Sequence, residues 1–248
     1  MSTTRKIIWL LLVTLPGLSL KCRPYCDVCP MPEPNCTGSY RGGLSLRAAS
    51  RAWLPAAAPD SLRFVNSNGF RAVLDRVGQP AVPDSVTLPA VPGDLSDYRE
   101  MTLAPQYLNC QPHFRARRVG WRYQGRNLNL DLRFNLFKNL GTGSPGAAMA
   151  LTRAVADTLP DLVTVSFNEE YFAGFPVAPV PYRQPRITGQ GRAVYLDSIR
   201  LAGRTYFGVY QFSRTPYFTV VQPQYFYFRP GQGLVGFIYS NNEQWGLL

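Results

Sequence analysis

The side chains with the most reactive chemistry are five cysteines, and four of them lie close together near the N-terminus. The four are Cys22, Cys26, Cys29 and Cys36, with the spacing C-x3-C-x2-C-x6-C. Thiolates of this kind can bind zinc or form disulfides. Zinc sites built from two C-x2-C pairs separate the pairs by many more residues, and this segment is interrupted by prolines. We therefore expect no metal here, and either disulfides or free thiols in an extended tether.

The segment before the cysteines has the pattern of a secretory signal peptide. Arg5 and Lys6 precede an apolar run at residues 7–15, and Pro16 and Gly17 follow it. The run is about half as long as the roughly 20 residues that a membrane-spanning helix needs. We predict that residues 1–21 direct export and are removed. A buried N-terminal strand or helix is the alternative.

Export permits disulfides, and the odd number of cysteines then needs an explanation. If Cys22 begins the mature chain and carries a lipid, four cysteines remain for two disulfides. Lys21 argues against lipidation, because bacterial lipoprotein signals normally have a small residue directly before the modified cysteine. The sequence thus leaves a lipoprotein and a soluble secreted form open. The disulfide candidates are Cys26, Cys29, Cys36 and Cys110.

Basic residues outnumber acidic residues, 26 against 15, which gives a formal net charge of +11. Such a charge raises nucleic acid or an anionic membrane as a partner. The basic residues are mostly arginines, however, and they are scattered without a run of charge. We therefore expect no nucleic-acid partner, and membrane contact only through a lipid anchor at Cys22.

Few residues offer the chemistry of catalysis. His113 is the only histidine, which excludes a His-rich metal site, and a Cys–His pair is a poor nucleophile and base in a chain that oxidises its cysteines. Glu169 and Glu170 are adjacent, so on a strand they point to opposite faces. We expect no catalytic residues and no metal, although acids such as Asp131 and Asp197 could approach one another in the fold.

Residues 141–146 match G-x-G-x-x-G, which in dinucleotide-binding folds forms the turn around the pyrophosphate. The strand before this motif alternates polar and apolar residues, whereas the first strand of a dinucleotide fold is buried on both faces. No further alternation of strand and helix follows. We interpret the motif as a Gly-rich turn between a hairpin and a helix, and we expect no cofactor.

Aromatic residues are concentrated in residues 195–248, where alternating strands would place about half of them on each face. Sheet propensity and core packing are one explanation. In the other, the outward set and its neighbouring arginines form a stacking surface for a glycan, peptidoglycan or protein partner. The candidate binding residues are Tyr206, Tyr210, Tyr225, Tyr227, Arg204, Arg214 and Arg229.

The elements that position these residues are mostly strands. Residues 128–136 alternate apolar and polar side chains, which predicts a half-buried strand, and residues 114–123 form its hairpin partner. A change of phase at Arg117 and Arg118 suggests a bulge. Residues 147–158 predict one helix, with Ser144 and Pro145 at its start and Pro160 after its end. Further strand signals lie at 62–64 and 70–73 around an Asn-Gly turn, and at 162–167, 194–201, 205–212, 217–228 and 233–239.

Strands at this spacing predict a mainly β fold. We expect an antiparallel sheet that forms a sandwich or a partly open barrel, with one covering helix. The expected organisation is a signal peptide at 1–21, a Cys/Pro-rich linker at 22–59 and a single β-rich domain at 60–248. Within the linker, Trp53 and Leu54 are expected to dock on the domain.

The C-terminal strands carry a resemblance to a group of proteins. The stretches TYFGVY at 205–210, YFYF at 225–228 and GLVGF at 233–237, ending near Trp245, resemble uncharacterised exported proteins and lipoproteins of the Bacteroidota type. The resemblance implies an exported β-domain with no catalytic residues to transfer.

We therefore expect an exported protein, in the cell envelope or secreted, that acts as a non-catalytic binding or structural module. Its partner would be an envelope protein or a glycan. The alternative is a secreted or envelope enzyme that acts on glycans or other envelope polymers.

Overall fold

The computed structural model describes residues 40–55, 58–78, 84–89, 91–92, 112–127, 129–142, 147, 150–168, 171–188, 191–214 and 221–248. Contacts divide the chain into Met1–Pro34 and Asn35–Leu248, and all the described residues belong to the second unit. The expected signal peptide, all five cysteines, the pair Glu169 and Glu170, and residues 143–146 of the Gly-rich motif therefore lie outside the described residues.

The described chain is mainly β, as the sequence predicts. The strands are β1 (Tyr40–Leu44), β2 (Ser61–Asn66), β3 (Arg71–Val77), β4 (Asp84–Pro89), β5 (Val91–Pro92), β6 (His113–Gly125), β7 (Asp131–Lys138), β8 (Gly141–Thr142), β9 (Asp161–Phe167), β10 (Tyr171–Pro176), β11 (Arg186–Thr188), β12 (Gly191–Leu201), β13 (Arg204–Arg214), β14 (Pro223–Arg229), β15 (Gly233–Tyr239) and β16 (Gln244–Leu247). The helices are α2 (Ala48–Arg51) and α5 (Arg153–Thr158). Within the described ranges, neither helix has the length and hydropathy needed to cross a bilayer.

One 14-stranded sheet contains almost all of these strands. Its main path runs in the order β10, β9, β7, β6, β3, β2, β16, β15, β14, β13, β12 and β11, and every neighbouring pair on it is antiparallel. The long strand β6 also pairs with β4 and, in parallel, with β1. Strands β5 and β8 form a separate parallel pair.

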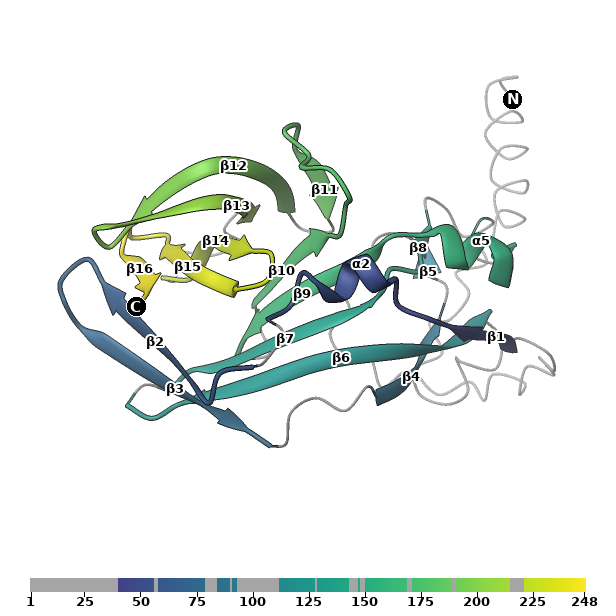
Figure 1. The fold of residues 1–248 in the computed structure, drawn as a ribbon, viewed down its shortest axis with the longest axis horizontal. Coiled ribbons are helices and arrows are strands. Elements are labelled where there is room, and N and C mark those ends of the chain that lie inside the picture. The colour runs from purple at the N-terminus through teal and green to yellow at the C-terminus, as the bar shows by residue number, and fades with distance from the viewer. Residues whose placement is uncertain are drawn as a thin grey trace, which may run out of the picture. The chain divides into compact units, whose positions relative to one another are not determined.

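The sheet curls until its two ends approach each other (Figure 1). β10 at one end lies near β11, β12 and β13 at the other. In the described chain no ladder of hydrogen bonds joins β10 to these strands. The fold is therefore a half-barrel, which is the partly open barrel that the strand pattern predicts.

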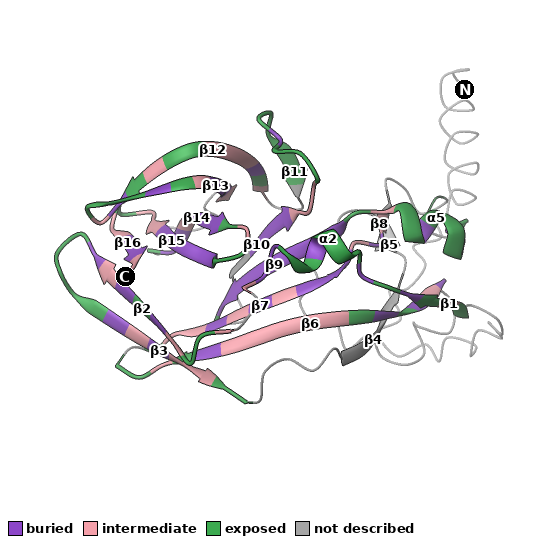
Figure 2. Ribbon diagram, viewed as in Figure 1, coloured by how far each residue is buried: buried purple, intermediate pink, exposed green. Residues whose placement is uncertain are grey.

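The main core fills the concave side of the half-barrel. Figure 2 shows the buried residues running along β9, β14 and β15. Aromatic rings dominate this core and contact one another at the angles that aromatic pairs favour, with Phe167 and Phe237 at 4.9 Å between ring centroids. Its fully buried aromatic side chains include Phe64, Tyr123, Phe167, Phe175, Phe212, Phe226, Phe228 and Phe237.

Two smaller clusters are buried on the outer face of the sheet. The cluster beside α5 explains why the bulge predicted at Arg117 and Arg118 is wrong. β4 pairs with β6 through Arg117 and Arg118 without any shift of register, so this pairing contains no bulge. Phe114 and Ala116 instead pack into the cluster beside α5, whereas Tyr123 packs into the concave core. Even- and odd-numbered residues of a strand lie on opposite faces. The change of phase in the apolar pattern of β6 therefore marks the point where its buried side chains change from the outer face to the concave face.

The covering helix differs from its prediction in length and number. Ala147 is helical, as the sequence predicts, but residues 150–152 are not, and α5 begins at Arg153. Thr152 is the N-cap of α5, since its hydroxyl accepts a hydrogen bond from the Val155 N–H. Ser144 and Pro145 lie outside the described residues. α2 is a second short helix, in a stretch whose composition of small and polar residues suggests a linker.

Residues 40–55 belong to the folded domain, although their composition places them in the linker. β1 pairs with β6, and Leu44 lies in the cluster beside α5. Trp53 and Leu54 dock on the body, where they are buried in the main core. The centre of the Trp53 ring lies 4.7 Å from that of the Tyr210 ring, and the backbone carbonyl of Trp53 accepts a hydrogen bond from the Gly231 N–H. A few well-placed apolar residues thus extend the domain to the N-terminal side of residue 60.

Candidate functional site

The tyrosines proposed as binding residues are mostly buried. Tyr206, Tyr210 and Tyr227 are 8%, 3% and 3% exposed, and Tyr225 is half-buried. Tyr210 faces the concave core, whereas Tyr206 and Tyr227 lie in an outer-face cluster. Burial raises the pKa of Tyr227 to about 12. Rings buried in this way offer no surface for stacking, so the core-packing explanation accounts for these three tyrosines.

The outer face is covered because the end of the β12–β13 hairpin folds over β15 and β16. A Cβ on Gly236 would lie 2.5 Å from Leu201, so the glycine makes room for that side chain. The Tyr206 hydroxyl donates a hydrogen bond to the Leu247 carbonyl on β16. Gly208, between Tyr206 and Tyr210 on β13, has φ +64°, a conformation that glycine adopts readily.

The three candidate arginines do not gather into one patch. Arg204 and Arg214 stand at opposite ends of β13, where they pair with Leu201 and Gly191. Arg229 is exposed at the end of β14 and donates a hydrogen bond to the side-chain oxygen of Gln232.

Each described acidic side chain has a basic or amide partner. Asp131 accepts hydrogen bonds from Arg122, and Asp197 is held by both terminal nitrogens of Arg183 at 3.0 and 2.9 Å. The hydrogen bond from Arg183 lowers the pKa of Asp197 below its usual value. Within the described ranges, no three His, Cys, Asp or Glu residues lie close enough together to hold a metal. The other pairs are Asp60–Arg76, Asp75–Arg126, Asp157–Arg153, Asp161–Lys138 and Glu243–Asn66.

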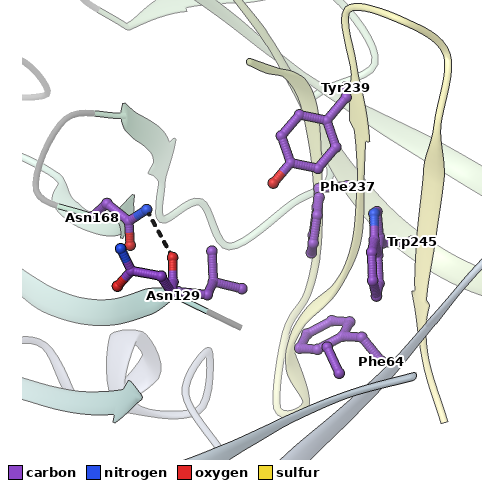
Figure 3. A pocket seen from close by; sticks show the side chains of 8 residues that line it. Phe64, Asn129, Asn168, Phe237, Tyr239 and Trp245 are labelled. Carbon is purple, nitrogen blue, oxygen red and sulfur yellow. Dashed lines mark hydrogen bonds between the residues drawn. The ribbon is translucent and has the colours of Figure 1, made fainter. Parts of the chain in front are cut away.

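A pocket of about 170 Å³ lies at the end of the half-barrel where β7 begins and β9 ends (Figure 3). We call it the mouth pocket. One wall is aromatic and comes from β2, β15 and β16, and the opposite wall comes from the residues before β7 and after β9. The lining residues are Phe64, Ala72, Asn129, Leu130, Asn168, Phe237, Tyr239 and Trp245.

Strand geometry builds the aromatic wall. Phe237 and Tyr239 are two residues apart on β15 and therefore lie on the same face. Trp245 is the cross-strand partner of Phe237, and their rings stack at 5.9 Å with 13° between their planes. Phe64 on β2 completes the wall at 5.6 Å from Phe237.

The opposite wall is held by Asn168. Its φ of +49° is a left-handed conformation that asparagine tolerates better than most residues. Its side-chain oxygen accepts a hydrogen bond from the Asp131 N–H at 2.7 Å, and its side-chain nitrogen donates to the Asn129 carbonyl at 3.3 Å (Figure 3). These two bonds hold the residues before β7 against the end of β9, and in Figure 3 the Asn129 amide points away from the aromatic rings.

One donor in the mouth pocket lacks an acceptor. Trp245 is 8% exposed, and its indole nitrogen is buried with no hydrogen-bond partner among the described residues. Leaving a buried donor unpaired costs about 1–3 kcal/mol. Because the nitrogen atom itself is buried, a molecule in the pocket meets the indole ring and not this donor.

No family model, curated protein or solved structure matches this chain. The eight residues that line the mouth pocket are all neutral, and none is an ionised acid or base that could transfer a proton at neutral pH. The arrangement can bind a molecule that combines an apolar face with hydrogen-bonding groups.

The sequence predicts strands at Phe64 and Phe237 but none at Trp245, and it marks none of the three as a site residue. It gave no role to Asn129 and Asn168. The alternation that puts Phe237 and Tyr239 on one face was visible in the sequence. The pairing of β16 with β2, which brings Trp245 beside Phe64, joins segments from the two ends of the domain and leaves no local signal.

Proposed function

We propose that this chain is an exported cell-envelope protein whose β-rich domain is a binding module, and that part of its partner enters the mouth pocket. The observation that carries this proposal is the aromatic wall of Phe64, Phe237, Tyr239 and Trp245 on one side of a pocket whose lining is entirely neutral. Pockets at the mouths of β-barrels are common ligand sites. Export is supported by the signal-like residues 1–21 and by the resemblance of the C-terminal strands to exported proteins.

The pairing of the acidic side chains favours binding over hydrolysis. A glycosidase needs two carboxyl groups about 5–10 Å apart on either side of the bond that it cleaves. Asp131 and Asp197 are each held by an arginine. A pocket lined by neutral residues lacks the acid and base that such a reaction requires.

The intact mass of the mature protein tests the export half of the proposal. We expect a chain that begins at Cys22, carries a diacylglyceryl group, and gains four hydrogens on reduction because two disulfides open. An unlipidated chain in the medium would remove the lipid anchor and make the protein a secreted module. A full-length chain in the cytoplasm would overturn export.

Co-sedimentation with purified, insoluble envelope polymer tests the binding half. Asn129 is exposed at the rim, so Asn129→Trp should block the pocket without disturbing the core. We expect this variant to lose most of its binding. Thr205→Trp is the matched control, because it adds the same bulk at an exposed position on the β12–β13 hairpin. Equal binding by the two variants, or no binding by the unmodified protein, would refute the proposal.

A further inference from the structure

We infer that the outer face of the half-barrel, at the end where the β2–β3 and β12–β13 hairpins turn, docks on an anionic phospholipid surface. We call this region the outer basic surface, and its residues are Arg63, Arg71, Arg200, Arg204 and Phe207. The inference goes beyond the proposed function, because this face is separate from the mouth pocket, whose aromatic wall belongs to the concave core.

Strand pairing gathers arginines that are scattered in the sequence. On the β2–β3 hairpin, Arg63 lies two residues from Val65, and Val65 is the cross-strand partner of Arg71. All three residues therefore lie on one face of the hairpin. This is the outer face, because the intervening residue Phe64 and the neighbouring residue Ala72 pack in the concave core.

The end of the β12–β13 hairpin brings Arg204 to the same region. Arg204 is the cross-strand partner of Leu201, and a Cβ on Gly246 of β16 would lie 3.0 Å from the Leu201 carbonyl. Gly246 is itself the cross-strand partner of Val65 on β2. Burial raises the pKa of Tyr206, whose hydroxyl bonds β16, and the nearby charge of Arg204 opposes that rise. The hairpin end thus lies beside the arginines of β2 and β3 (Figure 1).

Arg200 and Phe207 lie on the solvent side of that hairpin end. Leu201 and Tyr206 face β15 and β16, so the residues next to them in the chain point the other way. Phe207 is 63% exposed, and Arg200 is exposed as well. Because the hairpin end covers the outer face of the sheet, its solvent side points outward, as the arginines of β2 and β3 do.

The outer basic surface keeps its positive charge. None of its four arginines has an acidic partner in the part of the chain that the structure describes. The acidic side chains of the four strands are Asp75 and Asp197, and Arg126 and Arg183 already pair with them. Three positive charges remain even when a carboxylate at Leu248, beside β2, is counted against the four.

Positive charge around an exposed aromatic ring fits a lipid surface. Arginine binds phosphate oxygens through paired hydrogen bonds, and each basic residue near an anionic leaflet strengthens attachment. The Phe207 ring can leave water for the boundary between headgroups and acyl chains. A soluble polyanion would gain nothing from that ring. A single-stranded nucleic acid stacks its bases on successive exposed rings, but the outer-face tyrosines Tyr206 and Tyr227 are 8% and 3% exposed.

Sedimentation with phospholipid vesicles tests the inference. The protein is the full chain with Cys22→Ser, so that no acyl chain contributes. We expect stronger binding to vesicles of phosphatidylcholine and phosphatidylglycerol than to vesicles of phosphatidylcholine alone, and the difference should shrink as salt is added. The variant Arg63→Gln/Arg71→Gln/Arg204→Gln should bind the anionic vesicles about a hundredfold more weakly, since each arginine contributes about fivefold.

Matched variants separate this surface from net charge and from exposed rings in general. Arg41→Gln/Arg51→Gln/Arg192→Gln removes the same charge from exposed positions on β1, on α2 and at the start of β12, and should keep most of the binding. Phe207→Ser should weaken binding about tenfold at low and high salt alike. Phe70→Ser removes a similarly exposed ring outside the outer basic surface and should leave binding unchanged.

Three outcomes would overturn the inference. Equal binding to the two kinds of vesicle would remove the anionic lipid, and equal losses in the two triple variants would show that only net charge acts. If the chain binds polyphosphate or DNA through these arginines but binds no vesicle, the partner is a soluble polyanion. The mouth pocket is tested separately by Asn129→Trp, so the proposed binding function can stand when this inference fails, and the reverse.

Discussion

Lys138 and Asp161 form an ion pair that is almost completely buried, and its removal should cost the domain a large part of its stability. The two residues are cross-strand partners on β7 and β9, with 2.9 Å between the Lys138 ammonium and the Asp161 carboxylate. Their side chains are 1% and 0% exposed. Lys138 also donates to the Leu159 carbonyl at 3.2 Å, and the second carboxylate oxygen accepts from the Arg47 N–H at 3.0 Å.

Lys138→Met leaves the Asp161 carboxylate buried without a countercharge. Breaking a buried pair from one side costs about 3–5 kcal/mol, whereas a whole domain is stable by only about 5–15 kcal/mol. The double variant Lys138→Met/Asp161→Asn should lose much less unfolding free energy than the sum of the two single variants. No charge is left buried, and the side-chain oxygen of the new asparagine can still accept the hydrogen bond from the Arg47 N–H. We expect a coupling free energy of about 2 kcal/mol or more.

Urea unfolding at pH 7, followed by tryptophan fluorescence and circular dichroism, measures all four proteins of the cycle. Arg183→Met is the matched control, since it breaks a pair whose side chains are both 70% exposed and should change stability little. A loss below about 1 kcal/mol for Lys138→Met, or single losses that simply add in the double variant, would show that the pair is not buried in the way described.

Three further predictions concern the barrel and the pocket. Burial raises the pKa of Tyr227 from 10.0 to about 12, so the phenol ionises at a lower pH in the unfolded chain than in the folded chain. The stability that the neutral phenol contributes is complete below about pH 10 and is lost as the pH rises to about 12. Urea unfolding midpoints measured across that range test this loss. Gly236→Ala brings its new Cβ within 2.3 Å of a neighbouring carbonyl and should destabilise the domain by about 1–3 kcal/mol in the same assay, whereas Gly43→Ala, whose nearest atom is at 3.7 Å, should be nearly neutral. Asn168→Gly keeps the left-handed backbone but removes both side-chain hydrogen bonds, so hydrogen exchange at the Asp131 amide should become faster.

The turns and strands were predictable because their signals are local. The strand signals at 194–201 and 205–212 leave Ala202 and Gly203 for the turn between them, and both residues have positive φ in the structure, as a tight hairpin between two twisted strands requires. The Asn-Gly turn between β2 and β3 was equally clear: the Asn66 side-chain oxygen accepts hydrogen bonds from the N–H groups of Asn68 and Phe70. Periodicity of two predicted half of the strands to within a few residues, namely β2, β3, β6, β7, β9, β12, β13 and β15.

The side of the sheet that becomes buried was not predictable in the same way. Alternation tells which residues share a face, but it does not tell what covers that face. The outward tyrosine Tyr206 is buried only because β13 bends at Gly208 and the hairpin end lies over Gly236. The pocket depends in the same way on β16 pairing with β2, a contact between distant parts of the chain.

The mouth pocket joins the stability of the domain to its proposed function. The stacked aromatic core can support the cost of one unpaired donor at Trp245, because that cost of about 1–3 kcal/mol is small beside the apolar surface that the core buries. Because the Trp245 nitrogen is buried within that core, a molecule in the pocket can contact the aromatic rings but not the donor. The wall that a ligand would contact therefore follows from the same strand pairing that closes the fold, since β16 joins Trp245 to Phe237 on one side and to β2 on the other.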